Sequence, residues 1–202
     1  MTPVMIAAGT TTDLRAHLRA ATMAAHDLLD DAMQAASGWQ NRTDYARFLA
    51  VQHAARAPLE RWLADHAPRA LNPPLQTGLI AADLAALGLA LPASSPDFDL
   101  PRTRVGDALG AAWVLAGSAL GNRSIAKQVA RIGGGAWPTA FLGDDAMMRF
   151  WQGLRARIER PAPLAEADGA ADAAAAVFAH FLAATGQAVG QDQPRQAESV
   201  GA

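Results

Sequence analysis

Apolar residues recur every three or four positions along most of the chain, and this period predicts amphipathic helices. Segments rich in glycine, proline and serine separate the periodic stretches, and no stretch alternates convincingly as a strand does. The expected helices cover about 14–37, 44–66, 75–88, 103–132, 146–160 and 165–189. The sequence therefore predicts an all-α bundle of roughly six to eight helices.

The helical pattern resumes with the same character after the proline-rich loop 91–101, so this loop does not divide the chain into domains. We expect one helical domain over residues 12–189, between a flexible arm at 1–11 and a disordered tail at 190–202. Pro58 should kink the second helix or divide it in two. The expected N-caps are Thr12 or Asp13 for the first helix, Thr43 or Asp44 for the second, and Asp144 or Asp145 for the fifth.

The first helix places an imidazole and a guanidinium in line. His26 follows Arg19 by seven residues and Thr22 by four, so all three share one face, with His26 about 10 Å from Arg19 along the axis. The apolar stripe beside them consists of Leu14, Leu18, Ala21, Ala25 and Leu29. This arrangement suits a flat, apolar, metal-bearing ligand with anionic arms, such as heme. The alternative is a surface helix whose His26 and Arg19 face water.

The fourth helix carries glycines on one face. Gly106, Gly110, Gly117 and Gly121 are four, seven and four residues apart. Each glycine within a helix costs ~1 kcal/mol relative to alanine, so some close approach must offset that cost. Two explanations are open: a neighbouring helix packs against the bare backbone, or a flat ligand does. A heme between this face and His26 would explain both patterns at once.

Composition narrows the classes of function. A formal net charge of -2 argues against nucleic acid as a partner, because phosphate binding needs a basic excess. The lack of cysteine excludes disulfides, thiolate metal sites and iron–sulfur clusters. The first residues do not read as a signal peptide, and no stretch of ~18 apolar residues is free of charge. We therefore expect a cytoplasmic protein with no membrane partner. His53 and His180 lie on partly apolar faces and are expected to be packed.

Two segments resemble the heme oxygenase family, of the bacterial, biliverdin-producing type. LRAATMAAHDLLD (residues 18–30) resembles the family's proximal helix, in which Leu-Arg and Ala-Thr precede a histidine. WVLAGSALGNRSIAKQV (residues 113–129) resembles the bacterial distal helix, with its Gly-Ser and Leu-Gly pairs. Weaker similarity extends from about Leu14 to Leu182, in the family's order. The resemblance implies a single-domain heme-oxygenase-like bundle.

The resemblance also implies a role for each matched residue. His26 would be the proximal iron ligand, and Arg19 and Arg155 would contact the heme propionates. Gly117 and Gly121 would form the distal face, with Ser118 supporting a distal water. The residues expected to bind heme are Arg19, Thr22, His26, Trp113, Asn122 and Arg155, and those expected on the catalytic face are Gly117, Ser118 and Gly121.

The chain departs from the family pattern at four positions. Ala116 stands where bacterial relatives often carry Glu, and Asn122 where a second glycine is common. Trp113 replaces a frequent Tyr, and Trp151 replaces a basic residue that would reach a propionate. These changes affect the positions that would govern which meso carbon is cut, and whether heme is cut at all.

The resemblance implies oxidative cleavage of heme to biliverdin, carbon monoxide and ferrous iron, with O2 as oxidant. A separate reductase would supply electrons, since the sequence contains no flavin or nicotinamide fingerprint. A bacteriophytochrome is a candidate acceptor of the biliverdin. One rival hypothesis is a heme-binding protein that carries or senses heme without cleaving it. Another is a bundle of this fold that binds a different small molecule.

Overall fold

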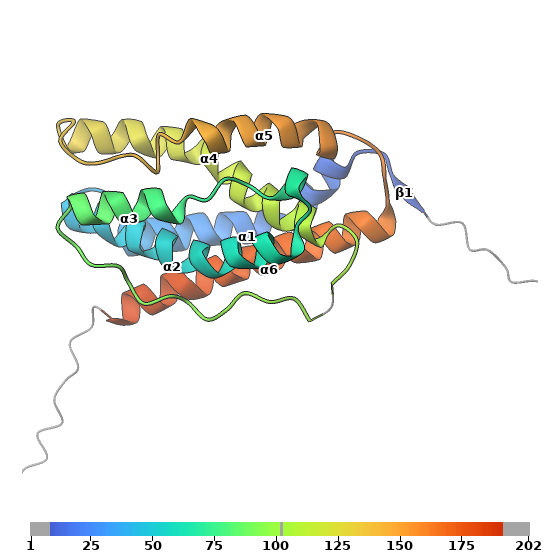
Figure 1. The fold of residues 1–202 in the computed structure, drawn as a ribbon, viewed down its shortest axis with the longest axis horizontal. Helices are drawn as coiled ribbons and strands as arrows, with labels where there is room; N and C mark the ends of the chain where they lie inside the picture. Colours follow the sequence, from blue (N-terminus) through green and yellow to red (C-terminus); the bar gives the residue numbers. More distant parts are fainter. Residues whose placement is uncertain (1–8, 102, 192–202) are drawn as a thin grey trace, which may run out of the picture.

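The computed structural model describes residues 9–101 and 103–191, with side chains described as far as 187. Within these residues the chain forms six α-helices, one 3-10 helix and two short strands (Figure 1). In chain order the elements are β1 (Thr10–Thr11), α1 (Leu14–Ser37), α2 (Arg42–His66), η1 (Arg69–Leu71), α3 (Thr77–Ala86), α4 (Asp107–Ile132), α5 (Asp145–Ile158), β2 (Ala162–Pro163) and α6 (Leu164–Gln191).

The long helix α6 lies at the centre of the bundle and packs on α1, α2 and α4. Contacts near both ends fix its direction relative to α1. Asp168 lies 3.3 Å from the His17 ring, and the Thr185 hydroxyl lies 3.2 Å from the sulfur of Met33. Helices α1 and α6 are therefore parallel. Helix α4 runs the same way, whereas α2 and α5 run in the opposite direction (Figure 1).

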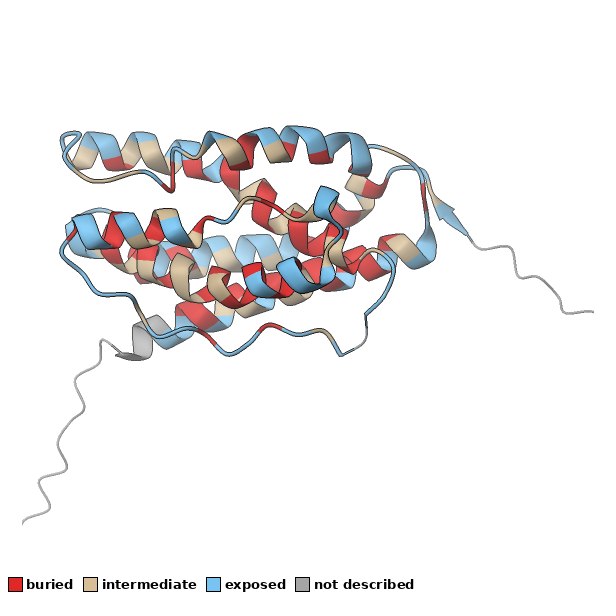
Figure 2. Ribbon diagram, in the orientation of Figure 1, coloured by how far each residue is buried: buried red, intermediate tan, exposed pale blue. Residues whose placement is uncertain are grey.

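Buried apolar side chains form two clusters. The larger lies among α2, α3, α4 and α6 and includes the fully buried Tyr45, Leu49 and Phe141. The smaller joins the first turns of α1 to α4 and α5 and includes Leu18. Between these clusters, residues 19–32 of α1 contribute no buried apolar side chain (Figure 2). The middle of α1, where the sequence predicts a site, therefore packs on α6 with little buried apolar surface and is otherwise exposed.

The predicted helices are present, with ends shifted by a few residues. Asp13 caps α1 by accepting from the Arg15 amide, and Asp144 caps α5 by accepting from the Ala146 amide, as predicted. The predicted cap of α2 is wrong. Asn41 caps this helix by accepting from the amide of Asp44, so the helix begins earlier than expected. Asparagine is among the strongest N-caps, and the periodic apolar pattern does not reveal it.

Pro58 does not divide α2, which is continuous from Arg42 to His66. Proline cannot donate to the carbonyl four residues earlier, here that of Ala54. The backbone amide of Ser95, in the loop after α3, donates to this carbonyl instead, at 3.3 Å. The proline-rich loop thus satisfies the acceptor that Pro58 leaves free.

Both ends of the predicted domain extend slightly further than expected. Thr10–Thr11, the last residues of the predicted arm, pair with Ala162–Pro163 in an antiparallel ladder. Helix α6 continues to Gln191, into the predicted tail. The rest of the predicted arm and tail, residues 1–8 and 192–202, lies outside the described residues.

Among the described helices, α6 is long and apolar enough by composition to cross a membrane. Its position gives another reason for its apolar character. It is the central helix of the bundle, and 56% of its most apolar window is buried inside the protein. Its sequence is therefore that of a core helix.

Two packed histidines make the fold sensitive to acid. Burial lowers the pKa of His53, and the charge of Glu60 only partly offsets this effect. Burial likewise lowers the pKa of His180, whose Nε2 lies 3.1 Å from the carbonyl of Ala55. The unfolded chain therefore binds protons more readily than the folded chain. Both histidines stabilise the fold above the ordinary histidine pKa of ~6.5, and this stabilisation is lost as the pH falls below it.

We expect the unfolding temperature to fall between about pH 7.5 and about pH 5.5, and to fall less in a His180→Gln variant, whose amide can still donate to Ala55. Thermal unfolding followed by circular dichroism at the two pH values measures this difference. His17→Gln is the matched control, because the His17 ring is partly exposed and lies near the Asp168 carboxylate, outside the two packed histidine sites. An equal loss of stability in the wild type and His180→Gln would contradict the assignment.

Candidate functional site

His26 lies midway along the contact between α1 and α6. Its ring meets the ring of Phe178 edge to face, with centroids 5.9 Å apart. Phe178 is buried, whereas the His26 side chain is 55% exposed. The imidazole therefore rests against α6 and has an open side. Both His26 and Arg19 are exposed, as expected for a surface helix, and one side of the His26 ring packs on Phe178.

Two of the glycines of α4, Gly117 and Gly121, lie near the level of His26 along the bundle. A Cβ at Gly110 would overlap the carbonyl of Ala170 on α6, so these two residues are in direct contact. Eight residues further along the two parallel helices, Ser118 is level with Phe178, since each helix rises about 1.5 Å per residue. His26, which contacts Phe178, is therefore level with the segment from Gly117 to Gly121.

Two observations connect α1 and the residues just after it to α4. Leu18 of α1 belongs to the same buried cluster as Ala116 and Ala119 of α4. Beyond the end of α1, the indole Nε1 of Trp39 donates to the side-chain oxygen of Gln128 at 2.7 Å. Between Leu18 and Met33, every residue of α1 except Thr22 is exposed or partly exposed.

The two ring nitrogens of His26 have different surroundings. Nδ1 lies 3.4 Å from a carboxylate oxygen of Asp30 and 3.6 Å from one of Asp27. Both carboxylates favour a proton on Nδ1, and a neutral imidazole then carries its lone pair on Nε2. Carboxylates commonly orient metal-ligating histidines in this way. The arrangement suits a ligand that coordinates through Nε2.

The glycine stripe divides into two halves. Gly106 and Gly110 are explained by packing, since a Cβ at either would overlap backbone of α6. A Cβ at Gly117 would meet only Trp151, at 3.8 Å, and a Cβ at Gly121 would meet no heavy atom within 4 Å. Packing therefore explains the first two glycines, and the face at Gly121 is open. The other explanation, a flat ligand, stays a prediction for Gly117 and Gly121.

The other residues of α1 and α4 that were predicted to bind heme differ in their burial and in their hydrogen bonds. Thr22 is buried, and its hydroxyl donates to the carbonyl of Leu18 at 2.8 Å within the same helix. Trp113 is partly buried, and its Nε1 has no hydrogen-bond partner among the described residues. Asn122 is buried, one residue after the open Gly121. Of these three, Trp113 offers an unused donor, and Thr22 is already engaged.

The two predicted arginines lie toward one end of the site. Arg155 on α5 binds Glu159 through Nε and Nη2, at 3.0 and 2.9 Å. The same carboxylate accepts from Arg15 on α1, at 2.8 Å. Arg19 lies one turn beyond Arg15, is exposed, and makes no ion pair within residues 9–101 and 103–191. Arg15 and Arg155 therefore share one carboxylate where the start of α1 meets the end of α5, and Arg19 lies one turn further along α1.

Two further side chains, of Trp151 and Arg56, lie near the glycines or contact the helix between them. Trp151 is buried against Gly117 and forms part of the core, so it stands in a wall of the site instead of reaching for an anion. Arg56 of α2 is fully buried, and its Nη2 donates to the hydroxyl of Ser118 at 2.8 Å. Ser118 therefore points toward α2, and its hydroxyl is engaged.

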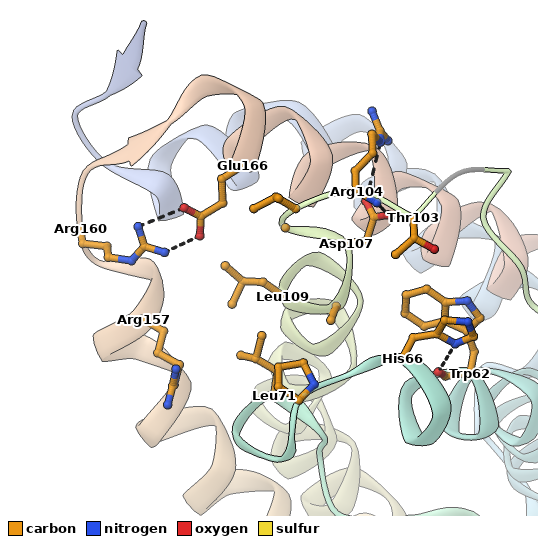
Figure 3. A pocket seen from close by; sticks show the side chains of 14 residues that line it. Trp62, His66, Leu71, Thr103, Arg104, Asp107, Leu109, Arg157, Arg160 and Glu166 are labelled. Carbon is orange, nitrogen blue, oxygen red and sulfur yellow. Dashed lines mark hydrogen bonds and ion pairs between the residues drawn. The ribbon is translucent and has the colours of Figure 1, made fainter. Parts of the chain in front are cut away.

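Two surface cavities lie elsewhere. One, of about 360 Å³, is bounded by the end of α2, the start of α4 and the end of α5 (Figure 3). Its walls include Trp62, Leu109 and the Arg160–Glu166 ion pair. The other, of about 320 Å³, lies between α2 and the loop after α3. Neither cavity contains a predicted heme contact. His26 and Gly121 are themselves exposed.

Comparison with known proteins supports the fold. No protein-family model matches the sequence, and no curated protein matches it by sequence. The structure is similar to the heme oxygenase of Neisseria meningitidis, known from crystal structures with NO and CO bound. The TM-score is 0.64 at 21% sequence identity, over 89% of this chain and 94% of that chain. This chain therefore has the all-α heme oxygenase fold.

Proposed function

We propose that this protein is a heme oxygenase, which binds heme between α1 and α4 and cleaves it to biliverdin, carbon monoxide and ferrous iron with O2 and external electrons. One observation carries the proposal. In a heme oxygenase fold, the half-exposed imidazole of His26 lies level with the bare backbone at Gly117 and Gly121. This combination supports a planar ligand with a metal at its centre.

The residues at this level fit heme by their chemistry. His26 provides a nitrogen ligand whose other nitrogen faces carboxylates. Gly121 provides a face without side chains, against which a flat ring can lie. Trp113 provides an unpartnered indole N–H. Arg19 and Arg155 provide guanidinium groups at one end, which suit two propionates.

When bound, heme supplies both the iron that activates O2 and the porphyrin that is cut. His26 would hold the iron through Nε2, with Asp27 and Asp30 keeping the proton on Nδ1. The bare backbone at Gly121 would let the ring lie close to α4. Trp151 would exclude water beside Gly117.

Arg19 and Arg155 would fix the rotation of the ring in its plane, and this rotation decides which meso carbon faces the distal helix. Arg155 would exchange its bonds to Glu159 for bonds to a propionate. Within residues 9–101 and 103–191, no acid–base pair meets a Cβ built at Gly117 or Gly121, so these glycines would offer bound heme a face without a proton-donating side chain. Electrons would come from a separate reductase, and a bacteriophytochrome is a candidate acceptor of the biliverdin.

The proposal is tested by turnover of the reconstituted protein. We expect heme, ascorbate or a reductase, and air to produce a broad red-absorbing biliverdin band together with carbon monoxide, and we expect one biliverdin isomer to predominate. Absorption spectra followed by chromatography of the extracted pigment measure both. A stable oxy complex that never yields biliverdin would contradict the enzyme and favour a heme carrier or sensor.

A further inference from the structure

Arg56 is a buried cation behind the glycine face of α4. It lies on α2 and is 1% exposed, and its Nε donates to the side-chain oxygen of Gln52 at 3.1 Å. Its guanidinium lies over the rings of Phe141 and Phe181, at 5.0 and 5.8 Å from their centroids. Nη2 donates to Ser118, and Nη1 has no hydrogen-bond partner among the described residues.

A buried charge is costly unless its surroundings compensate it. Burial lowers the pKa of Arg56 to about 10, and the charges of Glu60 and Asp144 oppose this shift, so the group stays protonated at neutral pH. The Glu60 carboxylate is itself engaged by the amide of Gln76 and the hydroxyl of Thr77. The contact of Arg56 with α4 is therefore made by a charged donor, and such hydrogen bonds are stronger than neutral ones.

Ser118 transmits this contact to the backbone of α4. Its hydroxyl accepts from Arg56 and donates to the carbonyl of Leu115 at 2.7 Å. Because the hydroxyl both accepts and donates a hydrogen bond, its orientation is fixed. Ser118 lies between Gly117 and Gly121, which lack side chains to stiffen the helix. The bond from Arg56 therefore holds α4 at the point where it is least constrained by its own side chains.

We propose that Arg56 is a positioning residue, which acts through Ser118 to hold the backbone from Gly117 to Gly121 in the shape that sets how heme lies against it. The functional part rests on the proposed heme site. The structural part, a clamp on α4, does not rest on that site, because its hydrogen bonds are present in the chain without heme.

The clamp is tested first on the heme-free protein by hydrogen exchange of the amides from Gly117 to Asn122. We expect Ser118→Ala to exchange roughly tenfold faster there than the wild type, because a hydrogen bond from a charged donor is lost. Ser118→Thr keeps the hydroxyl and should retain most of the protection. Ser124→Ala changes an exposed serine on the same helix and should leave exchange unchanged. Unaltered exchange in Ser118→Ala, or equally fast exchange in Ser118→Thr, would overturn the clamp.

The positioning role is tested by the product. We expect the wild type and Ser118→Thr to yield one main biliverdin isomer, and Ser118→Ala to yield a mixture, whereas simple loss of stability would lower the yield without changing the ratio. An unchanged isomer ratio in Ser118→Ala would overturn the positioning role. If the wild type fails to bind heme, the proposed function and this role fail together, while the hydrogen-exchange result still decides the clamp.

Discussion

Replacing His26 with glycine is expected to remove the Soret band of a histidine-ligated heme complex and to weaken heme binding at least ~10-fold, or ~1.4 kcal/mol. The side chain is half exposed and held from one side by Phe178, so its removal should leave the fold intact. Asp27 and Asp30 would lose only a neighbouring ring. Heme titration and thermal unfolding of the same sample separate loss of the ligand from loss of the fold.

Free imidazole supplies a direct check on this variant. It should enter the space left in His26→Gly and restore a histidine-like spectrum. His17→Ala is the matched control, because it removes an imidazole from the same helix, near Asp168, away from the glycine face. A His26→Gly protein with the wild-type spectrum and affinity would refute His26 as the iron ligand.

Adding one methyl group at Gly121 and at Gly110 is expected to have opposite effects on stability. At Gly121 a Cβ meets no heavy atom within 4 Å, so Gly121→Ala should stabilise the heme-free protein by ~0.5–1 kcal/mol through helix propensity. At Gly110 a Cβ would overlap the Ala170 carbonyl, so Gly110→Ala should destabilise by ~3 kcal/mol as α4 and α6 are forced apart. Denaturant unfolding of each heme-free variant measures these changes.

At Gly121 we expect the substitution to change heme affinity and stability in opposite directions. The added methyl group would stand on the face where the ring lies, so Gly121→Ala should bind heme at least ~10-fold more weakly while being more stable than the wild type. A change that stabilises the chain and weakens its ligand marks a glycine kept for binding. Equal heme affinity in the wild type and Gly121→Ala would remove the glycine face from the site.

Much of the fold follows from local pattern. The period of apolar residues predicts the helices, and Asp13 and Asp144 identify two of their starts. The start of α2 was missed because several good caps stand close together, and spacing alone does not choose Asn41. The continuity of α2 through Pro58 depends on the amide of Ser95, a contact between distant segments that no local pattern contains.

The candidate site was only partly predictable, because contacts between distant segments also decide it. Spacing places His26 and the glycines each on a helix face, but whether packing or open space faces each glycine depends on how α4 crosses α6. The burial of Arg56 could have been predicted from the sequence. It lies seven residues from both Leu49 and Leu63, which are fully buried, and so takes an apolar position on the inner face of α2. A charge at such a position indicates a buried polar contact, whose partner only the structure identifies.

The central claim, that heme binds between His26 and the open glycines, is tested most directly by titrating the wild-type protein with heme and following the absorption spectrum. We expect saturation at one heme per chain at micromolar concentrations, with a sharp Soret band typical of a histidine ligand. A titration that never saturates, or that gives only the spectrum of free heme, would contradict the account.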